Sequence, residues 1–485
     1  MQTSVANIYQ MMAKETKKIL IGGEWINGNN TISVHSPYDG SHIADVGLAD
    51  VNQLNTAKES AVNAVSEIKE LSRFEIASGL KKIAAEIERR KDEFIGTIIS
   101  ESAKPFRYAK GEVERGIATF HWAAGEVERF VGEVVPLDVQ PAGSGKTGYT
   151  KRVPRGVIYG ITPFNFPLNL VAHKVAPALA SGNAIIIKPS DRTPLTALLL
   201  GEVFLESGLP SSALQVVPMA VDLIDQVYSD ERIKMISFTG SAAIGWGLKS
   251  KADKKFVTLE LGGNAAVIVD STADIETSVK KCLVGAFSYS GQVCISVQRI
   301  YVHAHLFDEW LAKFTDGAGQ LVVGDPIDEA TELSVVIDKT SAMRIEEWID
   351  EAINSGAKIL CGGTRKGNLI LPTILTNASA ELKVVYEEAF APLVVIEKFS
   401  HFEDAIKMTN QSKYGLQTGV FTNDLRNAQY AIEHLESGTV LINEVPTFRV
   451  DNMPYGGVKD SGFGREGVRY AMEEMTEPKL IIIGR

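Results

Sequence analysis

The residue best suited to covalent chemistry is Cys294, which ends the run SGQVC at 290–294. A thiol acts as a nucleophile when it can ionise and when a substrate can reach it. The small residues that precede Cys294 leave room for a substrate carbonyl to approach the sulfur. Taken alone the run is a weak signal, because a cysteine in an apolar stretch is usually a buried packing residue.

Three further runs place polar groups where they could serve a site. In LELGGN at 259–264, Glu260 precedes two glycines, whose backbone can pass close to a ligand. In ITPFNFP at 161–167, prolines and aromatic residues surround Asn165, whose amide can donate hydrogen bonds. The run FTGSAAIG at 238–245 follows a strand pattern and opens a helix pattern, so it can offer N–H groups to a phosphate. Each run alone also fits an ordinary turn or loop, and the last lacks the GxGxxG spacing.

The elements that must position these residues alternate between helix and strand patterns. Residues 49–129 carry apolar residues at helical spacing, and residues 148–160 turn β-like. Buried strands are expected at 184–187, 214–217, 235–238 and 265–269, with a helix at about 194–207 between the first two. The alternation continues from about 272 to the end. We therefore expect an α/β fold with parallel sheets, and 485 residues are too many for one core.

Composition narrows the function classes. The net charge is −11 and the basic residues are spread along the chain, which argues against a nucleic-acid or anionic-membrane surface. The three cysteines and eight histidines show no disulfide framework and no metal-ligand spacing. The N-terminal run lacks the apolar core of a signal peptide, and no segment approaches about 20 apolar residues. We expect a cytoplasmic protein with no metal.

Taken together and in order, the runs resemble those of the aldehyde dehydrogenase superfamily. The resemblance extends from about Ile21 to the C-terminus, and Glu260 and Cys294 lie 34 positions apart, a spacing typical of the hydrolytic members. The runs that carry it are PFNFP at 163–167, KPSDRTP at 188–194, FTGS at 238–241, LELGGN at 259–264, GQVC at 291–294, EEAFAP at 387–392 and PYGGVKDSGFGREG at 454–467.

The resemblance implies a reaction mechanism for three of these residues. Cys294 is expected to attack the aldehyde carbonyl, and the Asn165 amide with the Cys294 backbone N–H to hold the resulting oxyanion. After hydride transfer to a nicotinamide, a thioester remains on the sulfur. Glu260 is expected to be the general base for its hydrolysis, which disfavours the coenzyme A-acylating branch.

The resemblance also implies an NAD site, with NADP as an alternative. Lys188 is expected to bind the adenosine ribose, Ser241 the pyrophosphate, and Glu388 with Phe390 the nicotinamide ribose. Family members that prefer NAD often carry Glu where this chain has Asp191, whose carboxylate would repel a 2′-phosphate. The expected cofactor residues are Thr162, Pro163, Phe164, Lys188, Ser190, Asp191, Gly240, Ser241, Leu261, Glu388 and Phe390.

Two departures from the usual motifs bear on the substrate. FAP stands at 390–392 in place of FGP, and with PTFRVDNMPYGGVKDS at 446–461 it resembles the branch of lactaldehyde and phosphonoacetaldehyde dehydrogenases. Val293 stands where several phosphate- or phosphonate-handling members place Arg, which disfavours a doubly charged substrate. We expect a small aldehyde, such as a 2-hydroxy aldehyde, in a narrow tunnel. Its expected contacts are Phe166, Arg115, Thr447 and Arg449, although each arginine also fits a structural salt bridge.

By the same resemblance, residues 15–135 and 155–262 should form a Rossmann-like cofactor-binding domain and residues 263–460 the catalytic domain. A β-hairpin near 136–154 and the C-terminal segment 476–485 should form an oligomerisation arm. The apolar run Leu480 to Ile483 supports this independently, because an exposed apolar edge aggregates unless a strand covers it. We expect a homodimer or homotetramer. Two other functions remain alternatives: a coenzyme A-acylating semialdehyde dehydrogenase, and a catalytically silent structural homologue.

Overall fold

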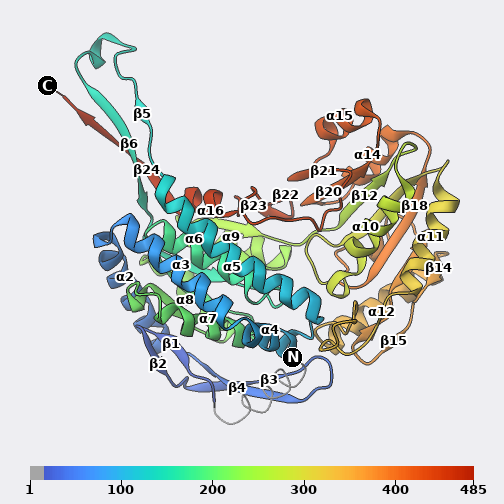
Figure 1. The fold of residues 1–485 in the computed structure, drawn as a ribbon, viewed down its shortest axis with the longest axis horizontal. Coiled ribbons are helices and arrows are strands. Elements are labelled where there is room, and N and C mark those ends of the chain that lie inside the picture. The colour runs from blue at the N-terminus through green and yellow to red at the C-terminus, as the bar shows by residue number, and fades with distance from the viewer. Residues whose placement is uncertain (1–15, 485) are drawn as a thin grey trace.

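The computed structural model describes residues 16–484. The chain forms two lobes, each built around a sheet, and a long β arm that projects from the first lobe (Figure 1). Among the described residues, no helix has both the length and the apolar character needed to cross a membrane.

The first lobe is built on a sheet of eight strands. Its central strands β9, β8, β7, β10 and β11 are parallel, and the outer strands are antiparallel to their neighbours. In spatial order the strands are β2 (Glu24–Ile26), β1 (Ile19–Ile21), β9 (Leu214–Val216), β8 (Ala184–Lys188), β7 (Val157–Ile161), β10 (Ile233–Thr239), β11 (Phe256–Glu260) and β23 (Gly462–Phe463).

Helices cover this sheet and bury its apolar strands, of which β8 is buried along its whole length. Helix α6 packs on β7 and β8, with α3 and α5 layered behind it, while α2 contacts β7, β8 and β9. The helices of this lobe are α2 (Val51–Glu70), α3 (Arg73–Arg89), α4 (Lys91–Ser102), α5 (Phe106–Arg129), α6 (Asn169–Ala180), α7 (Leu195–Leu205), α8 (Asp225–Tyr228), α9 (Ala242–Lys251) and α16 (Val468–Glu474), with the short 3₁₀ helices η2 (Ser211–Ala213) and η3 (Val221–Ile224).

The strand order of the first sheet reverses between β7 and β10. The chain passes from β7 outward to β8 and β9, then returns to add β10 and β11 on the other side of β7. In open α/β sheets, ligands bind at the carboxyl ends of the strands where the order reverses. The loops after β7 and β10 therefore mark the cofactor side of this lobe, and they carry Asn165 and Ser241.

The second lobe has a seven-stranded sheet in which β14 alone is antiparallel to its neighbour. Its strands in spatial order are β14 (Lys358–Cys361), β17 (Thr373–Thr376), β18 (Leu393–Phe399), β13 (Val297–His303), β12 (Ala265–Val269), β20 (Gln417–Phe421) and β21 (Thr439–Ile442). Its helices are α10 (Ile275–Phe287), η4 (Ser288–Gly291), α11 (Phe307–Gly319), α12 (Lys339–Asn354), α13 (Lys383–Tyr386), α14 (Phe402–Asn410) and α15 (Leu425–His434).

Three two-stranded pairs complete these lobes. They are β3 (Asn30–His35) with β4 (His42–Leu48), β15 (Arg365–Lys366) with β16 (Leu369–Ile370), and β19 (Tyr414–Gly415) with β22 (Val458–Lys459).

The arm consists of β5 (Val134–Val135), β6 (Thr147–Pro154) and the last strand, β24 (Thr476–Ile483), with η1 (Pro141–Gly143) at its turn. β24 pairs antiparallel with all of β6, from Thr476 opposite Pro154 to Ile483 opposite Thr147. Leu480, Ile482 and Ile483 are each at least half exposed along β24. Figure 1 shows these strands extending away from both lobes. The hairpin begins at Val134, slightly before the expected residue 136.

The expected α/β architecture is confirmed, and the strands expected at 184–187, 214–217, 235–238 and 265–269 coincide with β8, β9, β10 and β12. The chain crosses from the first lobe to the second between β11 and β12. After residue 460 it returns to the first lobe, where β23 pairs with β11 and α16 packs on α6.

Candidate active site

The carboxyl ends of the first sheet face the amino ends of the second. Glu260 ends β11, whereas Cys294 precedes β13 and Glu388 precedes β18. A cavity of about 180 Å³ lies where these segments meet. It is lined by Pro163, Phe164, Asn165, Leu170, Thr239, Gly240, Ser241, Glu260, Leu261, Gly262, Cys294, Glu388 and Phe390. The thiol, the carboxylate and the amide singled out from the sequence thus share one cavity.

Cys294 follows a strained turn. Tyr289, Ser290 and Gly291 all have positive φ, at 48°, 54° and 69°. Gly291 is required there, since a Cβ would collide with the Ala391 carbonyl. Burial raises the pKa of the Cys294 thiol to about 11, and the Tyr455 hydroxyl, 3.0 Å from the sulfur, opposes that rise. Burial therefore favours the neutral thiol over the thiolate.

Glu260 is buried, with 4% of its surface exposed. Neither of its carboxylate oxygens has a hydrogen-bond partner among residues 16–484. Burial, followed by the nearby Glu466, raises the pKa of Glu260 well above its usual range. A buried carboxylate without partners and with a raised pKa is suited to accept a proton from water near neutral pH.

Asn165 is buried beside the nucleophile's own loop. Its Nδ2 donates a hydrogen bond to the Gln292 carbonyl at 3.0 Å, two residues before Cys294. Its Oδ1 has no partner among the described residues. The bond fixes the amide next to the thiol, and the second N–H of Nδ2 is available to an oxyanion formed at that sulfur.

A network of buried charges lies behind Glu260. Glu466 accepts hydrogen bonds from Lys174 at 3.1 Å and from Arg449 at 3.3 Å. Although burial acts to raise it, these two cations bring the pKa of Glu466 below its usual range. His173 contacts Asp451 at 2.7 Å. The charges are paired, as buried charges must be.

The segments on the other side of the cavity fit a dinucleotide. Ser241 is the N-cap of α9 but makes no side-chain cap bond, so its hydroxyl and the first N–H groups of this ten-residue helix can bind a phosphate. A second cavity of about 340 Å³ adjoins this helix start and shares Ser241 and Glu388 with the first. Phe164 and Phe390 meet edge to face, with ring centroids 5.8 Å apart.

Glu388 lies against the glycines of LELGGN. Gly263 N–H donates to its carboxylate at 2.9 Å, and a Cβ at Gly262 would collide with the same carboxylate. Burial raises the pKa of Glu388 to about 7, despite that hydrogen bond and the nearby Arg344. The glycines are therefore needed so that strand β12 can begin beside a carboxylate.

The remaining expected cofactor residues lie at the ends of two neighbouring strands, Thr162 after β7 and Lys188, Ser190 and Asp191 at the end of β8. Lys188 Nζ donates to Asp191 at 2.6 Å, and the Lys188 carbonyl accepts a hydrogen bond from Thr162 N–H at 3.2 Å. Ser190 Oγ accepts from the Arg192 N–H in the same turn. These residues do not line the Cys294 cavity. Lys188, Ser190 and Asp191 lie at the end of β8, the strand next to β7, at the same edge of the sheet as the loops after β7 and β10.

The four expected substrate residues are not among those that line the Cys294 cavity. The Phe166 ring instead covers the buried ammonium of Lys104, 3.8 Å from its centroid. Arg115 pairs with Asp451 at 2.7 Å, and Arg449 with Glu466. Thr447 is partly exposed in the loop after β21.

Comparison with known proteins agrees with this geometry. The family model described as the aldehyde dehydrogenase family matches residues 25–481. The chain belongs to the aldehyde dehydrogenase family. It is 40% identical to 3-sulfolactaldehyde dehydrogenase of Priestia aryabhattai over 466 residues, covering 96% of this chain and 97% of the relative. It is 39% identical to lactaldehyde dehydrogenase of Methanococcus aeolicus over 470 residues, covering 96% and 99%.

Solved structures of aldehyde dehydrogenases superpose on nearly the whole chain. Aldehyde dehydrogenase 21 of Physcomitrella patens, in complex with the reaction product succinate, matches with a TM-score of 0.95 and 41% identity over 97% of this chain and 99% of its own. Glyceraldehyde-3-phosphate dehydrogenase of Methanocaldococcus jannaschii, complexed with NADP, matches with a TM-score of 0.90 and 37% identity over 94% and 100%.

Sequence reasoning missed three residues of this aldehyde dehydrogenase site. Tyr455 and Glu466 both lie in the run PYGGVKDSGFGREG, which was recognised only as a signature. Lys174 stands in the mainly apolar helix α6, which is buried at every position. A lysine in a buried, mainly apolar helix must find a buried partner such as a carboxylate, and that signal was available in the sequence.

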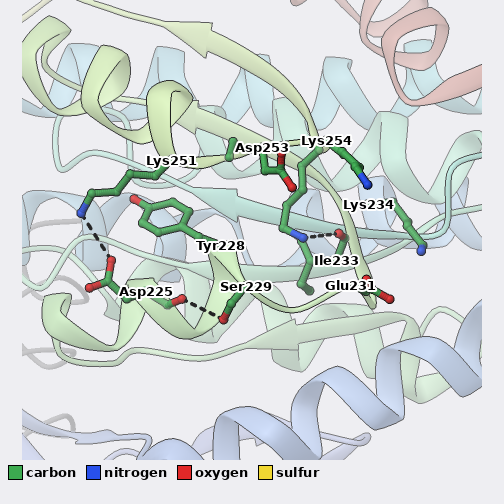
Figure 2. A pocket seen from close by; sticks show the side chains of 11 residues that line it. Asp225, Tyr228, Ser229, Glu231, Ile233, Lys234, Lys251, Asp253 and Lys254 are labelled. Carbon is green, nitrogen blue, oxygen red and sulfur yellow. Dashed lines mark hydrogen bonds and ion pairs between the residues drawn. The ribbon is translucent and has the colours of Figure 1, made fainter.

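A larger cavity, of about 670 Å³, lies elsewhere in this aldehyde dehydrogenase. Figure 2 shows it beside the starts of β10 and β11, with Lys251 reaching toward Asp225 and Lys234 and Lys254 on its other side. The Lys251–Asp225 contact is 3.4 Å. This cavity is at the amino ends of the strands, on the opposite edge of the sheet from Glu260, and it contains no cysteine. It is therefore separate from the site of the chemistry.

Proposed function

We propose that this aldehyde dehydrogenase oxidises a short 2-hydroxy aldehyde to its carboxylic acid, through a thioester on Cys294 and with NAD as the preferred cofactor. The observation that carries the proposal is the single cavity that joins the Cys294 thiol, Glu260 and Asn165 to the segments suited to a dinucleotide.

The first half of the reaction forms a bond to sulfur. The Cys294 thiolate attacks the aldehyde carbon, and the carbonyl oxygen becomes the oxyanion of a thiohemiacetal. The Asn165 amide and the Cys294 backbone N–H stabilise that charge. Because burial raises the pKa of the thiol to about 11, ionisation in this site needs help from neighbouring groups.

The second half releases the acid. NAD(P), when bound at the Ser241 and Glu388 segments, would accept the hydride, and loss of that hydride converts the thiohemiacetal to a thioester. Glu260 then takes a proton from water as the water attacks the thioester carbonyl. The carboxylic acid leaves and the Cys294 sulfur is regenerated.

The preference for NAD rests on Asp191. Its carboxylate accepts a hydrogen bond from Lys188 Nζ at 2.6 Å, and 42% of the Asp191 side chain is exposed, so a bound ligand can reach it. A 2′-phosphate placed there would meet a negative charge, and Lys188 would be neutralised by Asp191 instead of pairing with the phosphate.

The proposal of a short 2-hydroxy aldehyde as substrate is supported by the size of the cavity and by the substrates of the relatives. The cavity beside Cys294 is small, at about 180 Å³, which supports a short aldehyde. The relatives named above act on lactaldehyde and 3-sulfolactaldehyde. Neither Arg449 nor Thr447 lines this cavity, so a hydrogen bond from either to the substrate hydroxyl requires a substrate that reaches beyond it; the Nε of Arg449, which has no partner among the described residues, is the donor that would be available. One such bond corresponds to about a threefold to tenfold preference over a plain alkyl aldehyde.

Two alternatives make different predictions. A coenzyme A-acylating enzyme would need coenzyme A for turnover, whereas Glu260 provides a base for hydrolysis. A catalytically silent homologue would not reduce NAD with any aldehyde. Both are tested by the same aldehyde panel with and without coenzyme A.

We also propose that residues 15–135 and 155–262 form the cofactor-binding domain and that residues 263–460 form the catalytic domain, which contributes the nucleophile. We further propose a homodimer or homotetramer that assembles through the arm. The support is the row of exposed apolar residues on β24, which a partner strand would cover.

The experiment measures kcat/KM for lactaldehyde, 3-sulfolactaldehyde, propanal, octanal and benzaldehyde with NAD and with NADP. We expect lactaldehyde to exceed propanal by about threefold to tenfold. Cys294→Ala should abolish turnover, and Cys282→Ala should serve as the control, because Cys282 is buried in the second lobe. A lead by octanal or benzaldehyde would contradict the small cavity, and turnover in Cys294→Ala would contradict the mechanism.

A further inference from the structure

The nucleophile has a contact that the proposed mechanism does not use. Tyr455 Oη lies 3.0 Å from Cys294 Sγ, and only 2% of Tyr455 is exposed. Tyr455 forms a small apolar cluster with Ile295 and Leu416, against which Cys294 packs. The Tyr455 hydroxyl is thus the polar end of a side chain packed among apolar residues, and it contacts the Cys294 sulfur.

The direction of this hydrogen bond depends on the state of the sulfur. With a neutral thiol either group can donate. A thiolate has no proton, so the bond persists only with Tyr455 O–H as donor, and hydrogen bonds to charged acceptors are the stronger kind. The contact therefore favours the thiolate over the thiol.

Arg449 lies over the face of the same ring. Its guanidinium carbon is 3.6 Å from the centroid of the Tyr455 ring, and Glu466 holds it from behind at 3.3 Å. Only 7% of the Arg449 side chain is exposed, so water does little to screen its charge. A cation over the ring face draws electron density from the phenol and strengthens its O–H as a donor.

Charges from three segments face the sulfur. Glu260 of β11 and Glu388 of the loop before β18 oppose ionisation of the Cys294 thiol, whereas Arg449 favours it. Burial, followed by Cys294, raises the pKa of Tyr455 well above its usual range, and Glu260 adds to the rise while Arg449 opposes it. Tyr455 consequently keeps its proton and acts as a donor without transferring it.

We propose that Tyr455 is a further catalytic residue, whose hydroxyl holds the Cys294 sulfur and stabilises its thiolate, and that Arg449 is a positioning residue that acts through the Tyr455 ring. The proposal rests on the role of Cys294 as nucleophile in the proposed function. It assigns Arg449 a task that does not depend on which aldehyde is bound.

The test is alkylation of Cys294 by iodoacetamide, followed by mass spectrometry of the Cys294 peptide. In this reaction the sulfur forms a bond to carbon, iodide leaves, and the thiol proton passes to solvent. The rate reports the thiolate without any aldehyde. In Tyr455→Phe, which keeps the ring under Arg449, we expect alkylation at pH 8 to fall about tenfold to hundredfold.

The matched control is Tyr159→Phe. Tyr159 is also buried, and its hydroxyl donates to a sulfur, Met219 Sδ, at 3.4 Å in the first lobe. This variant loses the same kind of bond away from the site, so its Cys294 alkylation rate should equal that of the wild type. Circular dichroism confirms that both variants are folded.

A pH titration distinguishes an effect on the protonation of the Cys294 thiol from an effect on the access of iodoacetamide to it. Cys294-dependent absorbance at 240 nm, taken as the difference from Cys294→Ser in each background, reports thiolate directly. Tyr455→Phe should need a pH about one to two units higher than wild type for the same absorbance. Equal titration curves would show that Tyr455 controls only access and would overturn the proposal.

Two arginine variants test the positioning role. Arg449→Lys keeps a cation near the ring and should stay within about threefold of wild-type alkylation, whereas Arg449→Met should lose about tenfold. Equal rates in Arg449→Met and wild type would remove Arg449 from the proposal. Absence of Cys294 alkylation in the wild type at any pH would instead contradict the proposed function, so the two failures are distinguishable.

Discussion

Replacing Asn165 with Ala should slow the first half of the reaction and leave the second half intact. Asn165 is 3% exposed and its amide is fixed by one hydrogen bond to the Gln292 carbonyl, so its remaining N–H is already oriented before substrate binds. Loss of one such preorganised donor costs about 10²–10³ in rate, or about 2.7–4 kcal/mol of transition-state stabilisation.

The same substitution has a separate cost in stability. The Gln292 carbonyl loses its buried donor, which costs about 1–3 kcal/mol of the free energy of unfolding. Asn183→Ala is the matched control, because the buried Asn183 amide donates to Ser181 Oγ at 2.9 Å and to the Met475 carbonyl at 3.1 Å, away from the cavity. It should be destabilised at least as much, because Asn183 Oδ1 also accepts from Gly156 N–H at 2.9 Å, without a loss of rate.

The assay is stopped-flow formation of NADH in the first turnover with lactaldehyde, beside urea unfolding of each variant. Asn165→Ala should lose at least a hundredfold in the first-turnover rate, and Asn183→Ala less than threefold, as about expected for a donor remote from the oxyanion. A loss below tenfold in Asn165→Ala, or an equal loss in both variants, would refute the assignment of the oxyanion donor.

Three further predictions concern the cofactor, the fold and the assembly. Asp191→Ser should raise kcat/KM with NADP relative to NAD, because Lys188 becomes free to pair with a 2′-phosphate; higher use of NADP by the wild type would show that Asp191 is misassigned. Burial raises the pKa of Glu101 to about 8 from about 4.3 in an unfolded chain, so its stabilising effect is present at low pH and is lost as the pH rises toward 8. Glu101→Gln should therefore flatten the fall in Tm between about pH 5 and 8, and an unchanged slope would count against it. Leu480→Glu with Ile482→Lys should convert the proposed oligomer to a monomer in sedimentation velocity, and an unaltered sedimentation coefficient would contradict assembly through the arm.

Four strands, β8, β9 and β10 of the first sheet and β12 of the second, could be predicted from the sequence because their signal is local. Strand β12 contains five consecutive apolar residues and is fully buried, and its bounds coincide with the expected 265–269. The C-terminal strand was expected within 476–485 from the family resemblance, with independent support from its apolar run, and β24 pairs with β6 from Thr476 to Ile483.

The three reactive residues were identified from ordered motifs, and the structure brings them into one cavity. Their electrostatic environment could not be predicted in the same way. The Tyr455 hydroxyl meets the Cys294 sulfur across 161 positions, and Lys174 meets Glu466 across 292. Contacts at such separations are set by how distant segments of the chain pack against one another, and a motif of a few residues carries no information about that.

Phe166 illustrates the same limit. Its place between Asn165 and Pro167 suggested a tunnel wall, yet its ring covers Lys104. Lys104 pairs with Glu112, whose other oxygen accepts from Leu168 N–H and Asn169 N–H at the start of α6. The aromatic ring therefore belongs to the support of the Asn165 loop, a role that depends on a buried ion pair about 60 residues earlier in the chain.

The central claim is that the aldehyde becomes a thioester on Cys294 that Glu260 releases by hydrolysis. The most direct measurement is the intact mass, with peptide mapping, of Glu260→Gln after mixing with lactaldehyde and NAD. The account predicts a burst of NADH close to one per site and a lactoyl adduct that persists on the Cys294 peptide. A variant that turns over at the wild-type rate without an adduct, or an adduct on any other residue, would contradict it.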